Sequence, residues 1–378
     1  MDKQFEVFTD CVNFPLDRPC VFQKKDGRFC SFCKDYKKIS NPCSFARILI
    51  IKLGAMGDVL RTTFILEGLK ELYPESRISW IVGKNNAAVL EGNNLIDEII
   101  PNDGKTCEFL ALNYFDCAIN LDLAPESLAL AKLANAKRVL GYSLDNKRTI
   151  VPSNEYASKW LKLSAYDVLK KENTFTYQHW MSKIANLPKD DYEIIVPLSE
   201  VSKNKAQNFL KKNKIDGDKK IIAINPGAGK RWKMKKWRAD GFAAVARHFS
   251  SNGRVILLLG AIDDEEEINA LLKENIPNVF STGIDNSIAD FFAFVNLCDV
   301  LLCADTMALH AAAGLKKKTV ALFGPTSISE IETYGRGIKL QADIKCACCY
   351  RQDCDIKENC MKLLTDEEVI KAVERQLL

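Results

Sequence analysis

The stretch that decides the fold is RILIIKLGAMGD, from Arg47 to Asp58. Arg47 is followed by four consecutive aliphatic residues, Ile48 to Ile51, a pattern typical of a strand that is buried on both faces. Two glycines follow where this strand should end, and the apolar spacing from Asp58 to Tyr73 predicts a helix. A buried strand, a glycine-containing loop and a helix together indicate a parallel α/β sheet.

The same unit recurs along the chain and starts afresh after about residue 200. A second glycine-containing loop, Asn225 to Lys230, opens the later series. Two such series predict two doubly wound, Rossmann-like α/β domains that face a cleft. Apolar runs predict strands at 48–51, 78–82, 117–121, 138–140, 221–224, 255–259, 299–303 and 319–323.

We expect four segments: a cysteine-rich N-terminal extension (1–46), a first domain (47–198), a second domain (199–345) and a cysteine-rich tail with a final helix (346–378). Thr365 to Glu368 has the pattern of a capping box, which predicts the start of that helix. The tail is expected to cross back to the first domain.

The composition excludes several classes of protein. The chain has 378 residues, of which 47% are hydrophobic and 27% charged, so it can bury a large core and is not disordered. A net charge of +4 is small for a nucleic-acid-binding protein. The longest apolar run, 255–262, is far shorter than the ~18 residues of a membrane span. The first thirty residues lack an apolar stretch, so we expect no signal peptide and a cytoplasmic location.

The loop from Gly54 to Thr63 is the first candidate ligand site, because loops at the carboxyl edge of a parallel sheet bind ligands. Its spacing is not Gly-x-Gly-x-x-Gly and no acidic residue ends the second strand, which argues against a nicotinamide dinucleotide. Asp58 stands at the helix start. It is either an N-cap or a general base, and the two roles are compatible.

Two later loops are candidates for binding phosphate. Gly227 and Gly229 stand beside Lys230, a combination that suits a phosphate but also an ordinary solvated basic loop. The segment 305–314 follows a strand and opens a helix of small residues, whose N-terminal amides and Thr306 hydroxyl could hold a diphosphate. His310, one of only three histidines, is either structural or functional.

Taken together, these segments resemble glycosyltransferase family 9, the ADP-heptose heptosyltransferases of lipopolysaccharide core synthesis. The matching segments occur in the family's order and span about residues 47–378: 47–58, 225–229, Lys230-x-Trp232, Asp305-Thr306 with His310, and 323–326. The resemblance implies a two-domain GT-B fold and an inverting transfer of a sugar, with heptose expected, from a nucleotide diphosphate donor to a lipopolysaccharide-type acceptor. It also implies peripheral contact with the cytoplasmic face of the inner membrane.

The resemblance also implies roles for individual residues. Asp58 is the expected catalytic base, and Lys230 would contact the diphosphate. The nucleoside contact falls on Asp264 or Glu265. The remaining donor-side residues are Gly227, Trp232, Asp305, Thr306 and His310, and the acceptor-side loop contributes Gly54, Gly57, Arg61 and Thr62. The family usually has Gly after Asp-Thr, whereas this chain has Met307, which leaves the fit of the donor open.

These residue types suit inverting transfer. A base on one face of the sugar removes the acceptor proton, while cations and helix amides on the other face stabilise the departing diphosphate. The sequence has no Asp-x-Asp metal signature, so we expect catalysis to need no divalent metal.

Ten of the 14 cysteines lie near the two ends of the chain. Clusters of thiolates in a cytoplasmic protein more often bind metal than form disulfides. Three interpretations remain open: a structural zinc or iron site, an iron–sulfur cluster, and free thiols or disulfides. The candidate ligands are Cys30, Cys33, Cys346, Cys348, Cys349, Cys354 and Cys360, with Cys11 and Cys20 as further possibilities.

Two alternatives to the lipopolysaccharide enzyme remain. The first keeps the fold but transfers heptose to a protein side chain. The second is a nucleotide-binding metal or redox sensor.

Overall fold

The computed structural model describes residues 6–15, 18–38, 46–229 and 232–378, and the chain divides into two compact units, Met1–Ala46 and Arg47–Leu378. The described part of the smaller unit contains α1 (Val21–Asp26) and the short helix η2 (Cys30–Phe32). Cys11 pairs with Lys38 in an antiparallel bridge. The described residues of this unit thus form little regular structure.

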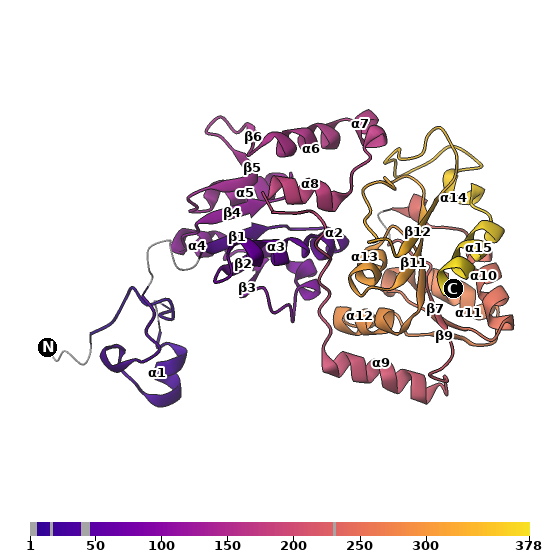
Figure 1. Ribbon diagram of the computed structural model, residues 1–378, viewed down its shortest axis with the longest axis horizontal. Helices are drawn as coiled ribbons and strands as arrows, with labels where there is room; N and C mark the ends of the chain where they lie inside the picture. Colours follow the sequence, from indigo (N-terminus) through magenta and orange to yellow (C-terminus); the bar gives the residue numbers. More distant parts are fainter. Residues whose placement is uncertain (1–5, 16–17, 39–45, 230–231) are drawn as a thin grey trace. The chain divides into compact units, whose positions relative to one another are not determined.

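The larger unit contains two six-stranded sheets (Figure 1). The first has the order β3-β2-β1-β4-β5-β6 and the second β12-β11-β10-β7-β8-β9, so each follows the doubly wound order 3-2-1-4-5-6. All neighbouring strands are parallel except β5 and β6. The strands are β1 (Arg47–Ile51), β2 (Arg77–Gly83), β3 (Glu98–Asn102), β4 (Cys117–Asn120), β5 (Val139–Leu144), β6 (Ile150–Pro152), β7 (Ile221–Asn225), β8 (Val255–Leu258), β9 (Val279–Ser281), β10 (Val300–Ala304), β11 (Lys318–Phe323) and β12 (Gly337–Gln341).

Helices flank both sheets, which confirms the expected pair of doubly wound α/β lobes. They are α2 (Met56–Thr62), α3 (Ile65–Leu72), η3 (Lys84–Val89), α4 (Thr106–Leu112), α5 (Pro125–Leu133), α6 (Glu155–Ala165), α7 (Asp167–Glu172), α8 (Tyr177–Ile184), α9 (Glu200–Lys212), η4 (Lys233–Lys235), α10 (Ala239–Ser251), η5 (Ile262–Asp264), α11 (Glu265–Lys273), α12 (Ile288–Leu297), α13 (Met307–Gly314), α14 (Cys360–Leu363) and α15 (Asp366–Leu377).

The single helix predicted from Asp58 to Tyr73 is wrong, because α2 and α3 are separate. The break falls at Thr63, whose Oγ1 accepts a hydrogen bond from the Ile195 amide at 2.9 Å. A β-branched residue with an outside partner interrupts the helix there. The break leaves α2 as a short helix whose first turn carries Asp58.

We expected the C-terminal tail to cross back to the first domain. This is wrong for its final helix, α15, which packs on the second lobe. The predicted capping box forms, because the Glu368 amide donates to Thr365 Oγ1 and the Thr365 amide to the Glu368 carboxylate. The apolar face of α15, with Val369 and Val373 fully buried, packs into the core of the second lobe. This face is covered by the second sheet and α10, so the first lobe is not needed to bury it.

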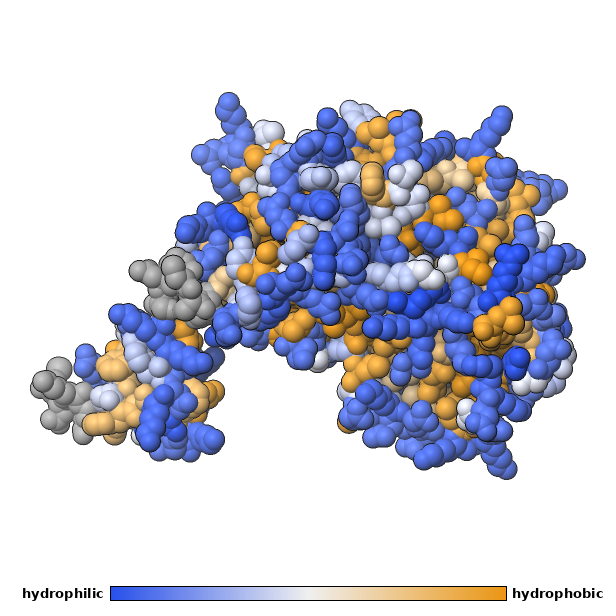
Figure 2. Space-filling model, viewed as in Figure 1, coloured by the Kyte–Doolittle hydropathy of each residue, from blue (hydrophilic) through white to orange (hydrophobic). Residues whose placement is uncertain are grey.

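Among the described residues, no helix is both long and apolar enough to cross a membrane. The face of the molecule in Figure 2 is mainly hydrophilic, with hydrophobic side chains in small groups.

Candidate active site

A cleft of about 1190 Å³ lies in the larger unit, where the loops after β1 and β4 face those after β7, β8, β10 and β11. In each sheet, the direction of winding reverses between two neighbouring strands. These are β1 and β4 in the first sheet, and β7 and β10 in the second. Ligands of doubly wound proteins bind at this reversal, outside the carboxyl ends of the strands. Both reversal points therefore line one cleft.

Asp58 enters the cleft from the first turn of α2. Its Oδ1 lies 2.8 Å from Nη2 of Arg61, and its side chain is 37% exposed. Burial alone raises the pKa of this carboxyl, but Arg61, Lys52 and His310 outweigh that effect and lower it. Asp58 is thus a carboxylate at neutral pH, the form in which it accepts a proton. Its Oδ2 also accepts the Ala55 amide at 3.3 Å, so Asp58 caps the helix as well.

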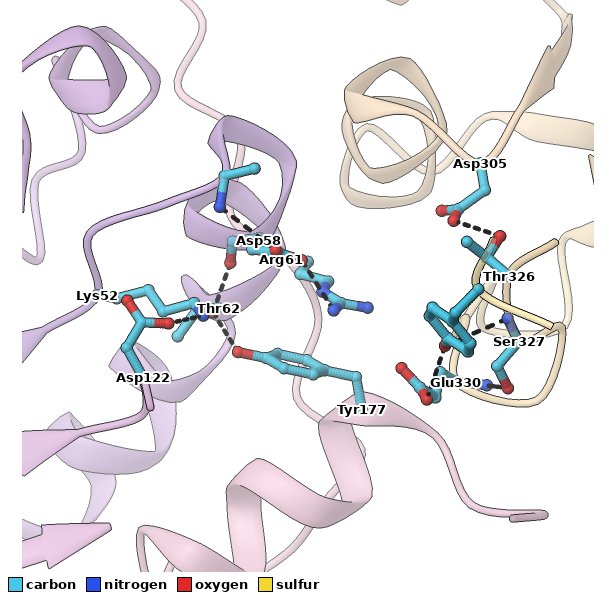
Figure 3. A network of polar contacts seen from close by, with 12 residues as sticks. Lys52, Asp58, Arg61, Thr62, Asp122, Tyr177, Asp305, Thr326, Ser327 and Glu330 are labelled. Atoms are coloured by element: carbon cyan, nitrogen blue, oxygen red, sulfur yellow. Dashed lines mark hydrogen bonds and ion pairs between the residues drawn. The ribbon is translucent and has the colours of Figure 1, made fainter. Parts of the chain in front are cut away.

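Further contacts hold the Asp58 side of the cleft in place (Figure 3). The guanidinium of Arg61 lies 3.8 Å above the ring of Tyr177, whose hydroxyl is 2.7 Å from Thr62 Oγ1. On the same side of the cleft, Lys52 forms an ion pair with Asp122, whose other oxygen accepts the Leu53 amide. Arg61 therefore extends into the cleft on a rigid support, whereas Thr62 is buried under the lining and does not face the cleft.

The start of α13 forms the opposite wall. Thr306 Oγ1 donates to Oδ1 of Asn225 at 3.0 Å, which links the loop after β10 to the loop after β7. Asp305 accepts hydrogen bonds from Lys235 Nζ at 2.7 Å and from Thr326 Oγ1 at 2.8 Å. Burial raises the pKa of Asp305, but Lys235 and His310 have the larger, opposite effect and lower the pKa to about 2. The amides that open α13 give this wall the partial positive charge of a helix N-terminus, which suits an anion.

His310 is 5% exposed and stands one turn into α13. Burial, together with the charge of Arg61, lowers the pKa of its imidazole to about 4, so it is neutral at pH 7. The two lobes approach closely here, because a Cβ at position 57 would lie 3.3 Å from Cδ2 of His310 and 3.4 Å from the Met307 Cα. Met307, the departure from the family pattern, thus lies where α2 meets α13.

The loops after β7 and β8 form one end of the cleft. Asp264 accepts hydrogen bonds from the amides of Ala261 (3.1 Å) and Gly229 (3.4 Å), and so ties the two loops together. A Cβ at Gly227 would lie 1.8 Å from Asp264 Oδ1, so only glycine allows the backbone at position 227 to lie this close to the Asp264 carboxylate. Trp232 also lines the cleft. Glu265 is exposed at the start of α11, outside the lining, so of the two acidic candidates only Asp264 faces the cleft.

Lys230, the expected diphosphate contact, lies outside the described residues. Most of the other predicted residues line the cleft together: Gly54, Gly57, Asp58, Arg61, Gly227, Trp232, Asp264, Asp305, Thr306 and His310. Sequence reasoning did not single out Lys52, Asp122, Asn225, Tyr177, Lys235, Glu330 or Tyr350. Asn225 and Lys235 do occur within the motif and the basic run that were considered.

All cysteines of the described chain are free thiols. Burial raises the pKa of Cys360, and nearby Cys346, Cys349 and Cys354 raise it further, so four candidate ligands lie in one neighbourhood. No three His, Cys, Asp or Glu side chains in 6–15, 18–38, 46–229 and 232–378 converge as a metal site, however. As these side chains lie, they do not fit a bound zinc or iron ion. Elemental analysis of the purified protein tests the metal expectation directly.

The chain is similar to known proteins in sequence and in fold. A model of glycosyltransferase family 9 (heptosyltransferase) matches residues 106–359. Lipooligosaccharide heptosyltransferase 2 of Campylobacter jejuni (strain 81116) is 34% identical over 164 residues, which cover 42% of this chain. The chain spans about half the length of this relative, 51%.

Two solved structures share the fold. One is a family 9 glycosyl transferase from Veillonella parvula, with a TM-score of 0.74 and 21% identity over 89% of this chain and 99% of that one. The other is Escherichia coli heptosyltransferase WaaC with ADP-2-deoxy-2-fluoro heptose, with a TM-score of 0.57 and 17% identity over 87% of this chain and 99% of that one.

Proposed function

Because the chain belongs to glycosyltransferase family 9, we propose that it transfers heptose from ADP-heptose to a lipopolysaccharide-type acceptor, with inversion at the anomeric carbon. The observation that carries this proposal is the opposition of Asp58 and α13 across one cleft. An ionised carboxylate on one lobe faces a helix N-terminus on the other. This is the pair of groups that inverting transfer requires.

In this proposal the donor lies along the second lobe. The nucleoside lies at the loops joined by Asp264, and the diphosphate at the start of α13, beside Thr306 and Lys235. Lys230 is assigned to the same diphosphate from its place in the family motif. The choice of ADP-heptose draws on WaaC, whose structure was solved with an analogue of that donor.

The chemical step uses the charges already described. The acceptor hydroxyl oxygen bonds to the anomeric carbon while Asp58 takes its proton. The bond from that carbon to the diphosphate oxygen breaks, and its electron pair leaves with ADP. The α13 amides, Thr306 and nearby lysines stabilise the negative charge that develops on the leaving group. Since the acceptor carries acyl chains, we propose that the reaction takes place at the cytoplasmic face of the inner membrane.

The test uses the full chain with ADP-, UDP-, GDP- and CMP-sugars. We expect ADP-heptose to raise the Tm most, and heptose to be transferred to lipopolysaccharide from a heptose-deficient strain. Transfer to a protein but not to lipopolysaccharide would support the alternative acceptor. Nucleotide binding without turnover, together with redox-dependent spectra, would instead identify a sensor and overturn the enzyme proposal.

A further inference from the structure

Glu330 lines the cleft from the loop after β11 and has no role in the mechanism above. Lining residues of the second lobe follow β9, β8, β7, β10 and β11, which are neighbours in this order along the sheet. Three strand spacings of about 4.8 Å place the β11 loop about 14 Å from the β8 loop. Since Asp264 marks the nucleoside end, Glu330 lies at the far end, beyond the start of α13, where donor and acceptor sugars meet.

The carboxylate of Glu330 is held from one side. Its Oε1 accepts a hydrogen bond from the hydroxyl of Tyr350 at 3.1 Å. Its backbone is fixed as well, because the carbonyl accepts the Tyr177 amide at 2.9 Å. The other carboxylate oxygen accepts no hydrogen bond from any residue that the structure describes. In Figure 3 the carboxylate faces Arg61 from across the cleft, with space between them.

Tyr350 connects this site to the cysteine-rich tail. It stands two residues after buried Cys348, and its own amide donates to the Pro325 carbonyl at 2.8 Å. Its hydroxyl also accepts the Ser327 amide at 3.3 Å. The ammonium of Lys170 lies 4.5 Å from the centre of the ring. These contacts hold the phenol ring in place. Its oxygen accepts the Ser327 amide, and its hydroxyl proton is donated to the Glu330 carboxylate.

The surroundings of Glu330 distinguish it from Asp58. Burial raises the pKa of Glu330, against the opposing charge of Arg61, whereas the pKa of Asp58 is lowered. A carboxylate with a free oxygen, next to the position of sugars, accepts hydrogen bonds from their hydroxyl groups. Such bonds to a charged group are stronger than bonds between neutral groups, and they select particular hydroxyl positions.

We propose that Glu330 is a specificity-determining residue that binds hydroxyl groups of the acceptor sugar, and that Tyr350 is the positioning residue that holds its carboxylate. This inference rests on the proposed function. It gives the cysteine-rich tail a part in substrate recognition through Tyr350. The acceptor is thus bound from both lobes, by the loop of Gly54 to Arg61 on one side and by Glu330 on the other.

The test compares Glu330→Gln and Tyr350→Phe with the wild-type full chain. The matched control is Glu332→Gln, because Glu332 is in the same loop but does not line the cleft. The substrates are ADP-heptose and lipopolysaccharide from a heptose-deficient strain. We expect Glu330→Gln to raise the acceptor KM about 10- to 100-fold, as expected for the loss of a hydrogen bond to a charged group. Tyr350→Phe should raise it less, and the Kd for ADP should stay within about twofold in both variants, because the nucleotide end is not touched.

Three results would overturn the inference alone: an unchanged acceptor KM in Glu330→Gln, an equal rise in the acceptor KM and the Kd for ADP, and a similar effect in Glu332→Gln. If Glu330→Gln does not fold, Tyr350→Phe still decides, because it keeps the ring and removes only the hydroxyl. A wild-type protein that transfers no heptose to this acceptor would instead overturn the proposed function, and this inference with it.

Discussion

The carboxyl groups that line the cleft, among them Asp58, Asp305 and Glu330, have pKa values that their neighbours shift in different directions. The pKa of Asp58 is lowered by Arg61 and Lys52 against the effect of burial, and Lys235 helps to bring that of Asp305 to about 2. Arg61 is only three residues from Asp58, but Lys235 is 70 residues from Asp305, and Lys52 is 70 residues from Asp122, with which it forms an ion pair. The motifs therefore predict which residues face the cleft, but not the ion pairs that set their charge.

Replacing the proposed base tests the first of these groups. Asp58→Asn keeps the size of the side chain and removes its ability to take a proton, so we expect kcat to fall roughly 10²- to 10⁴-fold. The Kd for ADP should change little. Steady-state kinetics and calorimetry check both expectations, with Asp218→Asn, an exposed position, as the control. A variant that turns over at the wild-type rate would leave Asp58 as a helix cap only.

His310 makes stability depend on pH. Its pKa is lowered from 6.5 to about 4 in the folded chain, so between these values the unfolded chain binds more protons. Stability is therefore lost as the pH falls from about 6.5 to 4, by up to about 3 kcal/mol from this group. Urea unfolding at pH 7 and pH 4.5 checks this. His310→Gln should lose less stability over that interval than the wild type, and an identical loss would contradict the prediction.

The strands predicted from apolar runs are the eight inner strands of the two sheets, and the four that were missed are the edges, β3, β6, β9 and β12. An inner strand of a parallel sheet is covered on both faces, so it needs a continuous apolar run. Edge strands are only partly buried here and carry polar residues: β12 reads GIKLQ, and none of its residues is fully buried. The apolar runs therefore predicted the central strands of each sheet, whose loops carry the site, and not the edge strands.

The meeting of α2 and α13 can be tested at Gly57. Alanine there suits a helix better by about 1 kcal/mol, but its Cβ would lie 3.3 Å from His310 and 3.4 Å from the Met307 backbone. We expect Gly57→Ala to separate the base from α13 and to lower kcat while the Tm changes little. Gly104→Ala is the control, because a Cβ at Gly104 has no neighbour within 4 Å among the described atoms. An unchanged kcat in Gly57→Ala would show that this contact does not set the distance between the lobes.

All the described residues that line the cleft belong to the larger unit. They lie between Leu53 and Tyr350, and the chain divides at Ala46. We therefore expect a chain that starts at Arg47 to keep the wild-type Tm, Kd for ADP and transfer rate. Thermal unfolding and kinetics of the truncated chain measure this. A large loss of transfer with an unchanged Tm would instead assign the first 46 residues to acceptor binding or to assembly.

Each sheet is built from one continuous stretch of sequence, the first from residues 47–152 and the second from 221–341, and the final helix ends on the second sheet. Each lobe's sheet thus comes from one uninterrupted segment of the chain, and a single connecting segment joins the two lobes. A break in that connecting segment would leave each half with a complete six-strand core. The two halves could then be made as separate polypeptides and reassembled as a split enzyme, whose activity would depend on their concentration and on a substrate that bridges them.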